Sequence, residues 1–141
     1  MDIEGIARNY LCAKGKVAVV GASPKKDRTS YEIMAYLLKN GITTFPVNPA
    51  YAGEDILGAE CLASVKDLPE DVGIIDMVVS AAHQEQILRE IGELPGRPVV
   101  WFQPGAENEK GEKELEERGF QVVSRACIMV VHSLYCADQE E

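Results

Sequence analysis

The stretch Val17-Ala18-Val19-Val20-Gly21-Ala22-Ser23-Pro24-Lys25-Lys26-Asp27-Arg28-Thr29-Ser30 decides the fold of this chain. Its first four residues are apolar and mostly β-branched, which is typical of a strand covered on both faces. A glycine and a short cationic loop follow, and then Ser30, a residue type that often caps helices. A strand that passes through such a loop into a helix presents backbone N–H groups and the positive end of the helix dipole to an anion. The stretch therefore predicts a phosphate-binding loop.

Strands and helices alternate along the rest of the chain, mostly across short loops. Strands are predicted at 17–20, 43–47, 74–79, 99–102 and 120–123, and helices at 30–39, 82–94 and 108–118. A helical turn is expected at 63–67, an amphipathic helix at 1–13, and a short sixth strand or a return segment at 127–131. This order indicates parallel β-α-β units with right-handed crossovers. The predicted fold is α/β: one Rossmann-like domain over residues 1–141 with a tail from 133, and a doubly wound parallel sheet of order 3-2-1-4-5.

Composition and charge exclude several classes of function. The net charge of -9 argues against binding to nucleic acid or to an anionic membrane, since both need a positive field. No apolar run approaches the roughly 20 residues that cross a bilayer. The four cysteines show no C-x-x-C spacing, so reduced thiols in a cytoplasmic protein are expected. Two histidines and dispersed cysteines predict no metal site.

The loop after the first strand differs from the common nucleotide-binding motifs. Gly21 is its only glycine, so the loop lacks both G-x-G-x-x-G and G-x-x-x-x-G-K-[ST]. The second strand ends in Asn48 rather than in the acid that receives an adenosine ribose. NAD is therefore the weaker candidate, and the cluster of Lys25, Lys26 and Arg28 favours a ligand with more phosphate. A solvated basic turn is the alternative interpretation of that cluster.

Several segments together resemble the small standalone CoA-binding proteins, relatives of the CoA-binding domain in the alpha subunit of succinyl-CoA synthetase. These segments are 21–28 with Ser30-Tyr31, Phe45-Pro46-Val47-Asn48-Pro49, Ile56-Leu57-Gly58, Leu68-Pro69, and Val100-Trp101-Phe102-Gln103-Pro104-Gly105 with Asn108-Glu109. The resemblance covers about residues 13–132. It departs from the family pattern at two places. The family's D-V-F-R corresponds here to a segment that starts at Asp76 and lacks both aromatic and arginine, and near Cys127 a charged pair is altered and an acid is lost.

The resemblance implies a Rossmann-like domain that binds coenzyme A or an acyl-CoA. The diphosphate would lie over the first loop, the adenine end near the loop after the second strand, and the pantetheine arm along Ser80 and Gln103. The cofactor-binding residues that it implies are Gly21, Ala22, Ser23, Lys25, Lys26, Arg28, Ser30, Tyr31, Asn48, Pro49, Ser80 and Gln103.

No catalytic residue is expected in this chain. An acyl-transferring relative needs a phosphorylatable histidine in a second domain, for which the chain is too short. His83 is expected at a helix start in a capping or surface role, and the spacing of His132 from Cys127 does not place the two on one helix face. Cys127 is interpreted as a small buried hydrophobe, or alternatively as a thiol that forms a mixed disulfide with bound CoA.

The leading hypothesis is a CoA-binding protein without catalysis of its own, with a homodimer or a partner subunit as expected assemblies. The enzymatic alternative is the CoA-binding subunit of an NDP-forming acyl-CoA synthetase, active only with a second chain. A third reading is an NAD(H)-binding Rossmann module, against which Asn48 argues.

Overall fold

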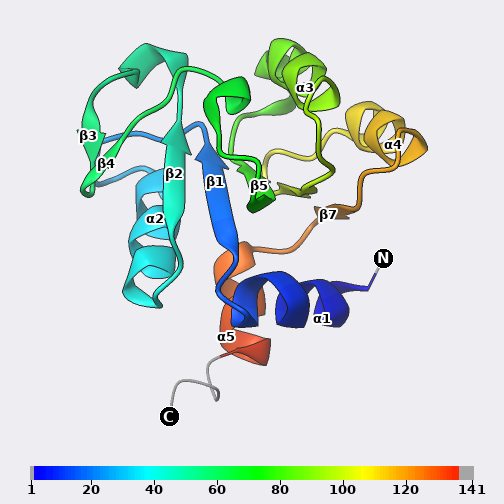
Figure 1. Ribbon diagram of the computed structural model, residues 1–141, viewed down its shortest axis with the longest axis horizontal. Helices are drawn as coiled ribbons and strands as arrows, with labels where there is room; N and C mark the ends of the chain where they lie inside the picture. Colours follow the sequence, from blue (N-terminus) through cyan, green and yellow to red (C-terminus); the bar gives the residue numbers. More distant parts are fainter. Residues whose placement is uncertain (1, 137–141) are drawn as a thin grey trace.

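The computed structural model describes residues 2–136 and shows a parallel sheet between two layers of helices (Figure 1). The strands of this sheet are β1 (Lys16–Val20), β2 (Thr44–Val47), β5 (Val72–Met77), β6 (Val99–Phe102) and β7 (Val122–Ser124). A separate antiparallel pair consists of β3 (Asp55–Ile56) and β4 (Ala59–Glu60). The α-helices are α1 (Ile3–Ile6), α2 (Thr29–Lys39), α3 (Glu85–Gly92), α4 (Glu109–Glu117) and α5 (Ile128–Tyr135). The remaining helical elements are the π-helix η1 (Ala7–Cys12), which continues α1, and the 3-10 turns η2 (Pro49–Tyr51), η3 (Val65–Asp67) and η4 (Ala81–His83).

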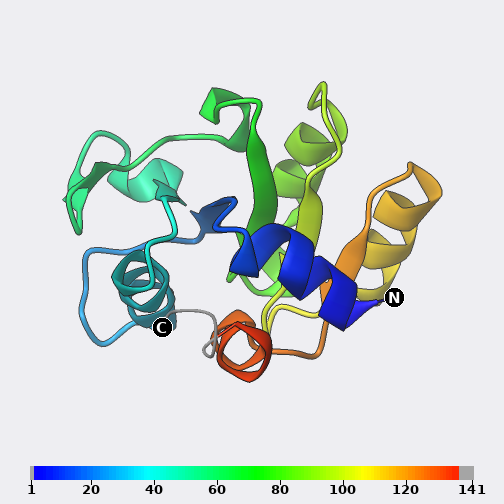
Figure 2. The ribbon, with the colours of Figure 1, turned by 60° about the horizontal axis from the view of Figure 1, so that its bottom comes forward.

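Both faces of the sheet are covered, as its apolar strands predict. On one face α2, α5 and the N-terminal helix pack against residues such as Val19 and Trp101, and Figure 2 shows these helices together on that face. On the other face α3 and α4 contribute Ile91 and Leu115 to a core with Ile75. Successive side chains of a strand point to opposite faces, so each strand serves both cores. The predicted doubly wound α/β fold is confirmed.

The strand order differs from the one expected. The sheet runs β2-β1-β5-β6-β7. When its five strands are numbered in chain order, this order is 2-1-3-4-5 and not the predicted 3-2-1-4-5. The segment around Leu62, which follows β4, pairs with the outer edge of β2. The Leu62 amide donates to the Pro46 carbonyl at 2.9 Å, and Val47 and Leu62 form a β-bridge. Pro46 itself has no N–H to donate, which an edge strand tolerates. The third strand of this sheet, β5, therefore pairs with β1 on the side away from β2, where Val20 lies beside Met77.

Two further elements differ from the prediction. Residues 127–131 lead into α5 and form no sixth strand, so the segment predicted as a tail from 133 starts inside a helix, and its last part, 137–141, lies outside the described residues. Helix α2 begins at Thr29, with Arg28 in the N-cap position and no side-chain capping bond. Ser30 is consequently not the cap but a buried residue of the first turn.

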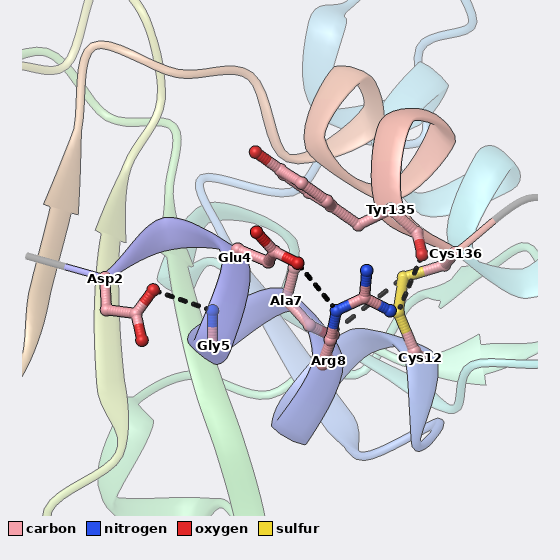
Figure 3. A network of polar contacts seen from close by, with 8 residues as sticks. All are labelled: Asp2, Glu4, Gly5, Ala7, Arg8, Cys12, Tyr135 and Cys136. Carbon is pink, nitrogen blue, oxygen red and sulfur yellow. Dashed lines mark hydrogen bonds and ion pairs between the residues drawn. A yellow bond between two sulfur atoms is a disulfide. The ribbon is translucent and has the colours of Figure 1, made fainter.

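Cys12 and Cys136 form a disulfide, which corrects the expectation of reduced thiols (Figure 3). The bond joins the end of η1 to the residue that follows α5, across 124 residues of sequence. Sequence spacing could not reveal it, because the two cysteines meet only when both terminal helices pack side by side on one face of the sheet. Cys61 and Cys127 are free thiols, and burial raises the pKa of Cys61 above its ordinary value.

None of the helices within residues 2–136 has the length and apolarity that crossing a lipid bilayer requires.

Candidate functional site

Two cavities open at the carboxyl end of β1, on either side of Gly21. The first, which we call the loop cavity, has a volume of about 500 Å³ and lies against the start of α2. The second, the α3 cavity, has about 480 Å³ and lies between the end of β2 and helix α3. Gly21 and Asn48 line both of them. Because β2 and β5 flank β1 on opposite sides and their connections cover opposite faces, this is the switch point at which doubly wound sheets bind ligands.

A larger groove of about 670 Å³ lies elsewhere, between α3 and α4. Acidic and basic side chains of these exposed helices alternate along it, for example Glu85, Arg89 and Arg118. No strand of the sheet ends in its lining, whereas doubly wound sheets bind ligands at the carboxyl ends of their strands. We therefore place the candidate site at the two cavities around Gly21.

The loop cavity has its hydrogen-bond donors at the helix start and not at the glycine. The amides of Gly21 and Ala22 both donate to the Val47 carbonyl, at 2.9 and 3.3 Å. In contrast, the amides of Thr29 and Ser30 make no hydrogen bond to any described residue, as expected for the first turn of a helix. Both residues line the loop cavity, together with Arg28. This end of the cavity therefore presents two amides, a helix dipole and a guanidinium to an anion.

Asn48 joins the two loops that border the cavities. Its side-chain nitrogen donates to the Ala22 carbonyl at 2.9 Å, and its side-chain oxygen accepts from the Ala50 amide at 2.9 Å. A carboxylate at this position would have no donor for Ala22. The structure thus explains why asparagine stands where a dinucleotide-binding domain has an acid.

Half of the residues predicted for the site line one of the two cavities. These are Gly21, Ser23, Arg28, Ser30, Asn48 and Pro49. Among the others, Ala22 and Tyr31 belong to a small apolar cluster beneath the loop, and Lys25 and Lys26 are exposed on the loop outside both linings. Ser80 is exposed ahead of η4.

Gln103 also lies outside both linings, and its role is structural. It is 3% exposed, and its side-chain oxygen accepts from the Ile128 amide at 2.8 Å. Its nitrogen lies 3.5 Å from the Cys127 sulfur. Gln103 therefore holds the start of α5 against the end of β6, and keeps the half-buried Cys127 thiol at this edge of the sheet.

The structure adds site residues that sequence reasoning missed. The loop cavity includes Asp27, Thr29, Ala50, Tyr51 and Val78. The α3 cavity includes Ser64, which donates to Glu90 at 2.8 Å, and Gln86, which donates to the other oxygen of Glu90 at 3.1 Å. The spacing of Gln86 and Glu90 by four residues on a predicted helix was the available signal. Nothing local to the sequence showed that Ser64 would meet that helix.

Two further polar residues, His83 and Asp76, lie at or near the candidate site. His83 belongs to η4, as its expected place at a helix start suggests, and it lines the α3 cavity. Asp76 lies in the centre of β5, between Val19 and Trp101, and its carboxyl is fully buried without a hydrogen-bond partner. Desolvation raises its pKa well above the ordinary value. No group of three or more metal-binding side chains occurs within residues 2–136.

Comparison with known proteins shows which family and which chains this protein resembles. Residues 15–133 match the model of the family described as CoA binding domain. The uncharacterized protein YneT of Bacillus subtilis is 30% identical over 127 residues, which cover 90% of this chain and 92% of YneT. A hypothetical protein from Pyrococcus horikoshii has a solved structure with a TM-score of 0.85 and 34% identity, covering 96% of this chain and 92% of that one.

Longer proteins share the same region. The ADP-forming acetate–CoA ligase of Methanocaldococcus jannaschii is 29% identical over 122 residues. The match covers 86% of this chain but only 17% of the ligase. This chain is thus similar to one part of such a ligase.

Proposed function

Since the chain belongs to the CoA binding domain family, we propose that it binds coenzyme A or an acyl-CoA across the loop cavity and the α3 cavity, without catalysis of its own. The observation that carries this proposal is the contrast between the two cavities, which meet at Gly21. One presents unpaired amides and a guanidinium, and the other has mostly apolar walls. Coenzyme A has the matching parts, a diphosphate and a nucleoside.

The diphosphate fits the loop cavity. The Thr29 and Ser30 amides would donate to its oxygens, and Arg28 would add charge-assisted bonds. Lys25 and Lys26 extend from the same loop into solvent, so they would attract the ligand through their charge rather than through fixed bonds. Asp27 in the lining offsets part of the positive charge of the loop, Arg28 included, and the main anchor would be the helix start with Arg28, because both line the cavity.

The adenosine fits the α3 cavity. Val47, Val65 and Ile87 offer apolar surface to the base, and the Ser64–Glu90 pair is a polar group at the same wall. The pantetheine arm would then leave the diphosphate across Val78, which follows β5, towards Gln103, whose backbone amide donates to the Met77 carbonyl at 3.0 Å at the end of β5. Its thiol end would approach the edge where Gln103 holds Cys127.

A second candidate function rests on the relatives. Several are named as ADP-forming acetate–CoA ligases, and one is the alpha subunit of such an enzyme from Pyrococcus furiosus, of which the match covers 29%. Under this alternative the chain supplies CoA binding to a catalytic partner, and a second protein should co-purify with it. The NAD(H) reading is disfavoured because Asn48 offers no carboxylate to a ribose diol, and its amide instead joins the loops after β1 and β2.

The proposal includes one domain over residues 1–141, located in the cytoplasm, where coenzyme A is used. The domain size is supported by YneT, since the match covers 92% of that protein. The disulfide makes the location testable, because such bonds are rare in the cytoplasm of most organisms. Alkylation of intact cells followed by mass spectrometry would show whether Cys12 and Cys136 are already blocked there.

Native mass spectrometry and calorimetry test the ligand. We expect the isolated protein to bind CoA at micromolar concentration and to gain thermal stability from it, with weaker effects from dephospho-CoA and NADH. An increase in melting temperature with NADH but none with CoA would refute the proposal.

A further inference from the structure

Val78 and Val79, which follow β5, border the two cavities, and we call this pair of residues the wall. Val78 lines the loop cavity and Val79 lines the α3 cavity. This wall lies directly against Gly21, where a Cβ atom would be 2.8 Å from a Val79 methyl group and 3.4 Å from the Val79 nitrogen. Gly21 also has a φ of +95°, which favours glycine. A displacement of Val79 would therefore change both the α3 cavity and its contact with the first loop.

Gln84, between η4 and α3, holds this wall. It is fully buried, and its side-chain nitrogen donates to the Val79 carbonyl and to the Ala106 carbonyl, both at 2.7 Å. Its side-chain oxygen accepts from the Asn108 side chain at 2.9 Å. One amide thus ties the end of β5 to the loop after β6 and to the start of α4.

We propose that Gln84 is a positioning residue for ligand binding, which acts by fixing Val79 as the wall of the α3 cavity. The inference rests on the proposed function, because it assigns the adenosine to that cavity. Only an amide supplies both donors and an acceptor here: glutamate would bring no donor when ionised, and an apolar residue would leave the two carbonyls and the Asn108 amide unpaired. The role is therefore specific to glutamine.

The test is calorimetry on Gln84→Met and the wild type with three probes: CoA, adenosine 3′,5′-bisphosphate and 4′-phosphopantetheine. We expect CoA and the bisphosphate to bind at least about tenfold more weakly to the variant, by analogy with the lower end of the losses seen when the outer-shell partners of metal ligands are removed. Phosphopantetheine should bind within about twofold of the wild type, because its contacts lie outside the α3 cavity. A loss of structure alone would weaken all three probes alike.

Asn108→Ser is the matched control. It breaks the bond to Gln84 from the α4 side but leaves Gln84 bonded to Val79, and serine can still cap α4 in place of the Asn108 oxygen that accepts from Gly111. We expect CoA affinity within about twofold of the wild type even where the melting temperature falls. If Gln84→Met does not fold, Val79→Ala removes the Val79 side chain from the same cavity, and it should weaken the binding of CoA and of the bisphosphate but not that of phosphopantetheine.

The outcomes separate the two proposals. A wild type that does not bind CoA refutes the proposed function and this inference with it. A wild type that binds CoA, together with a folded Gln84→Met that binds it equally well or loses all probes equally, refutes only the role of Gln84. The same holds if Asn108→Ser shows the full loss.

Discussion

The side-chain nitrogen of Asn48 donates a hydrogen bond of 2.9 Å to the Ala22 carbonyl, and this bond joins the loop after β2 to the loop after β1. The two loops border both cavities, so their relative position sets the shape of the candidate site. The same bond accounts for an asparagine where NAD-binding domains have an acid.

Asn48→Asp should weaken CoA binding by at least about tenfold and lower the free energy of unfolding by about 1–3 kcal/mol. The aspartate keeps the acceptor for the Ala50 amide but loses the donor to Ala22, and it brings negative charge towards the expected phosphates. Calorimetry and urea unfolding measure the two effects. If the variant gained NADH affinity instead, the NAD reading would regain support.

Arg28→Ala should cost more CoA affinity than Lys25→Ala and Lys26→Ala combined. All three side chains are exposed, but only Arg28 lines the loop cavity, where a lost charge-assisted bond is worth about 1.5–3 kcal/mol. The lysine pair should act mainly at low salt, because it attracts the ligand from outside the cavity lining and salt screens such long-range attraction. Titrations at two salt concentrations measure this ranking, with Lys113→Ala, an exposed residue of α4, as the control.

The double variant Cys12→Ala, Cys136→Ala should lower the free energy of unfolding by about 2–5 kcal/mol, because the disulfide closes a very long loop. CoA affinity should stay unchanged, since neither residue lines a cavity of the candidate site. Urea unfolding with and without a reductant provides the measurement. The reductant should destabilise the wild type and leave the double variant unaffected. An unaffected wild type would show that the bond contributes nothing.

Asp76→Leu should stabilise the protein more at pH 8 than at pH 4. The pKa of Asp76 is raised in the folded state, so the folded state favours the protonated carboxyl. Its contribution to stability is complete below the unfolded pKa of about 3.9 and is lost as the pH rises towards the folded value. Leucine has nothing to ionise and removes that loss. Equal effects at both pH values in urea unfolding would show that Asp76 does not titrate as the burial predicts.

Much of the fold could be predicted because its signals are local. The runs at 17–20 and 99–102 lie inside observed strands, and the highly charged segment at 108–118, predicted as a helix, matches α4 within a residue at each end. Helix starts were harder. Ser30 has the right residue type for a cap, but α2 extends back to Thr29, because helix termini depend on the loop that leads into them.

The candidate site was predicted only in part. The loop after β1 carries its own signal in residue type and order, and Arg28 and Ser30 do line the loop cavity. Ser64, Glu90 and Gln84 carry no such signal, since each acts through partners from distant segments. Gln103 illustrates the opposite case: it lies at the predicted edge of the sheet, but its amide is used to hold α5.

By itself the sequence determined the alternation of strands and helices and the two-sided burial of the sheet, because periodicity and residue type act over a few neighbouring residues. It also singled out the loop where we propose that an anion binds. Tertiary structure alone decided the strand order, the Cys12–Cys136 bond and the wall that Gln84 holds. Each of these depends on which distant segments occupy a sheet edge or share a face. That outcome follows from competition among long-range contacts, which no short stretch of residues encodes.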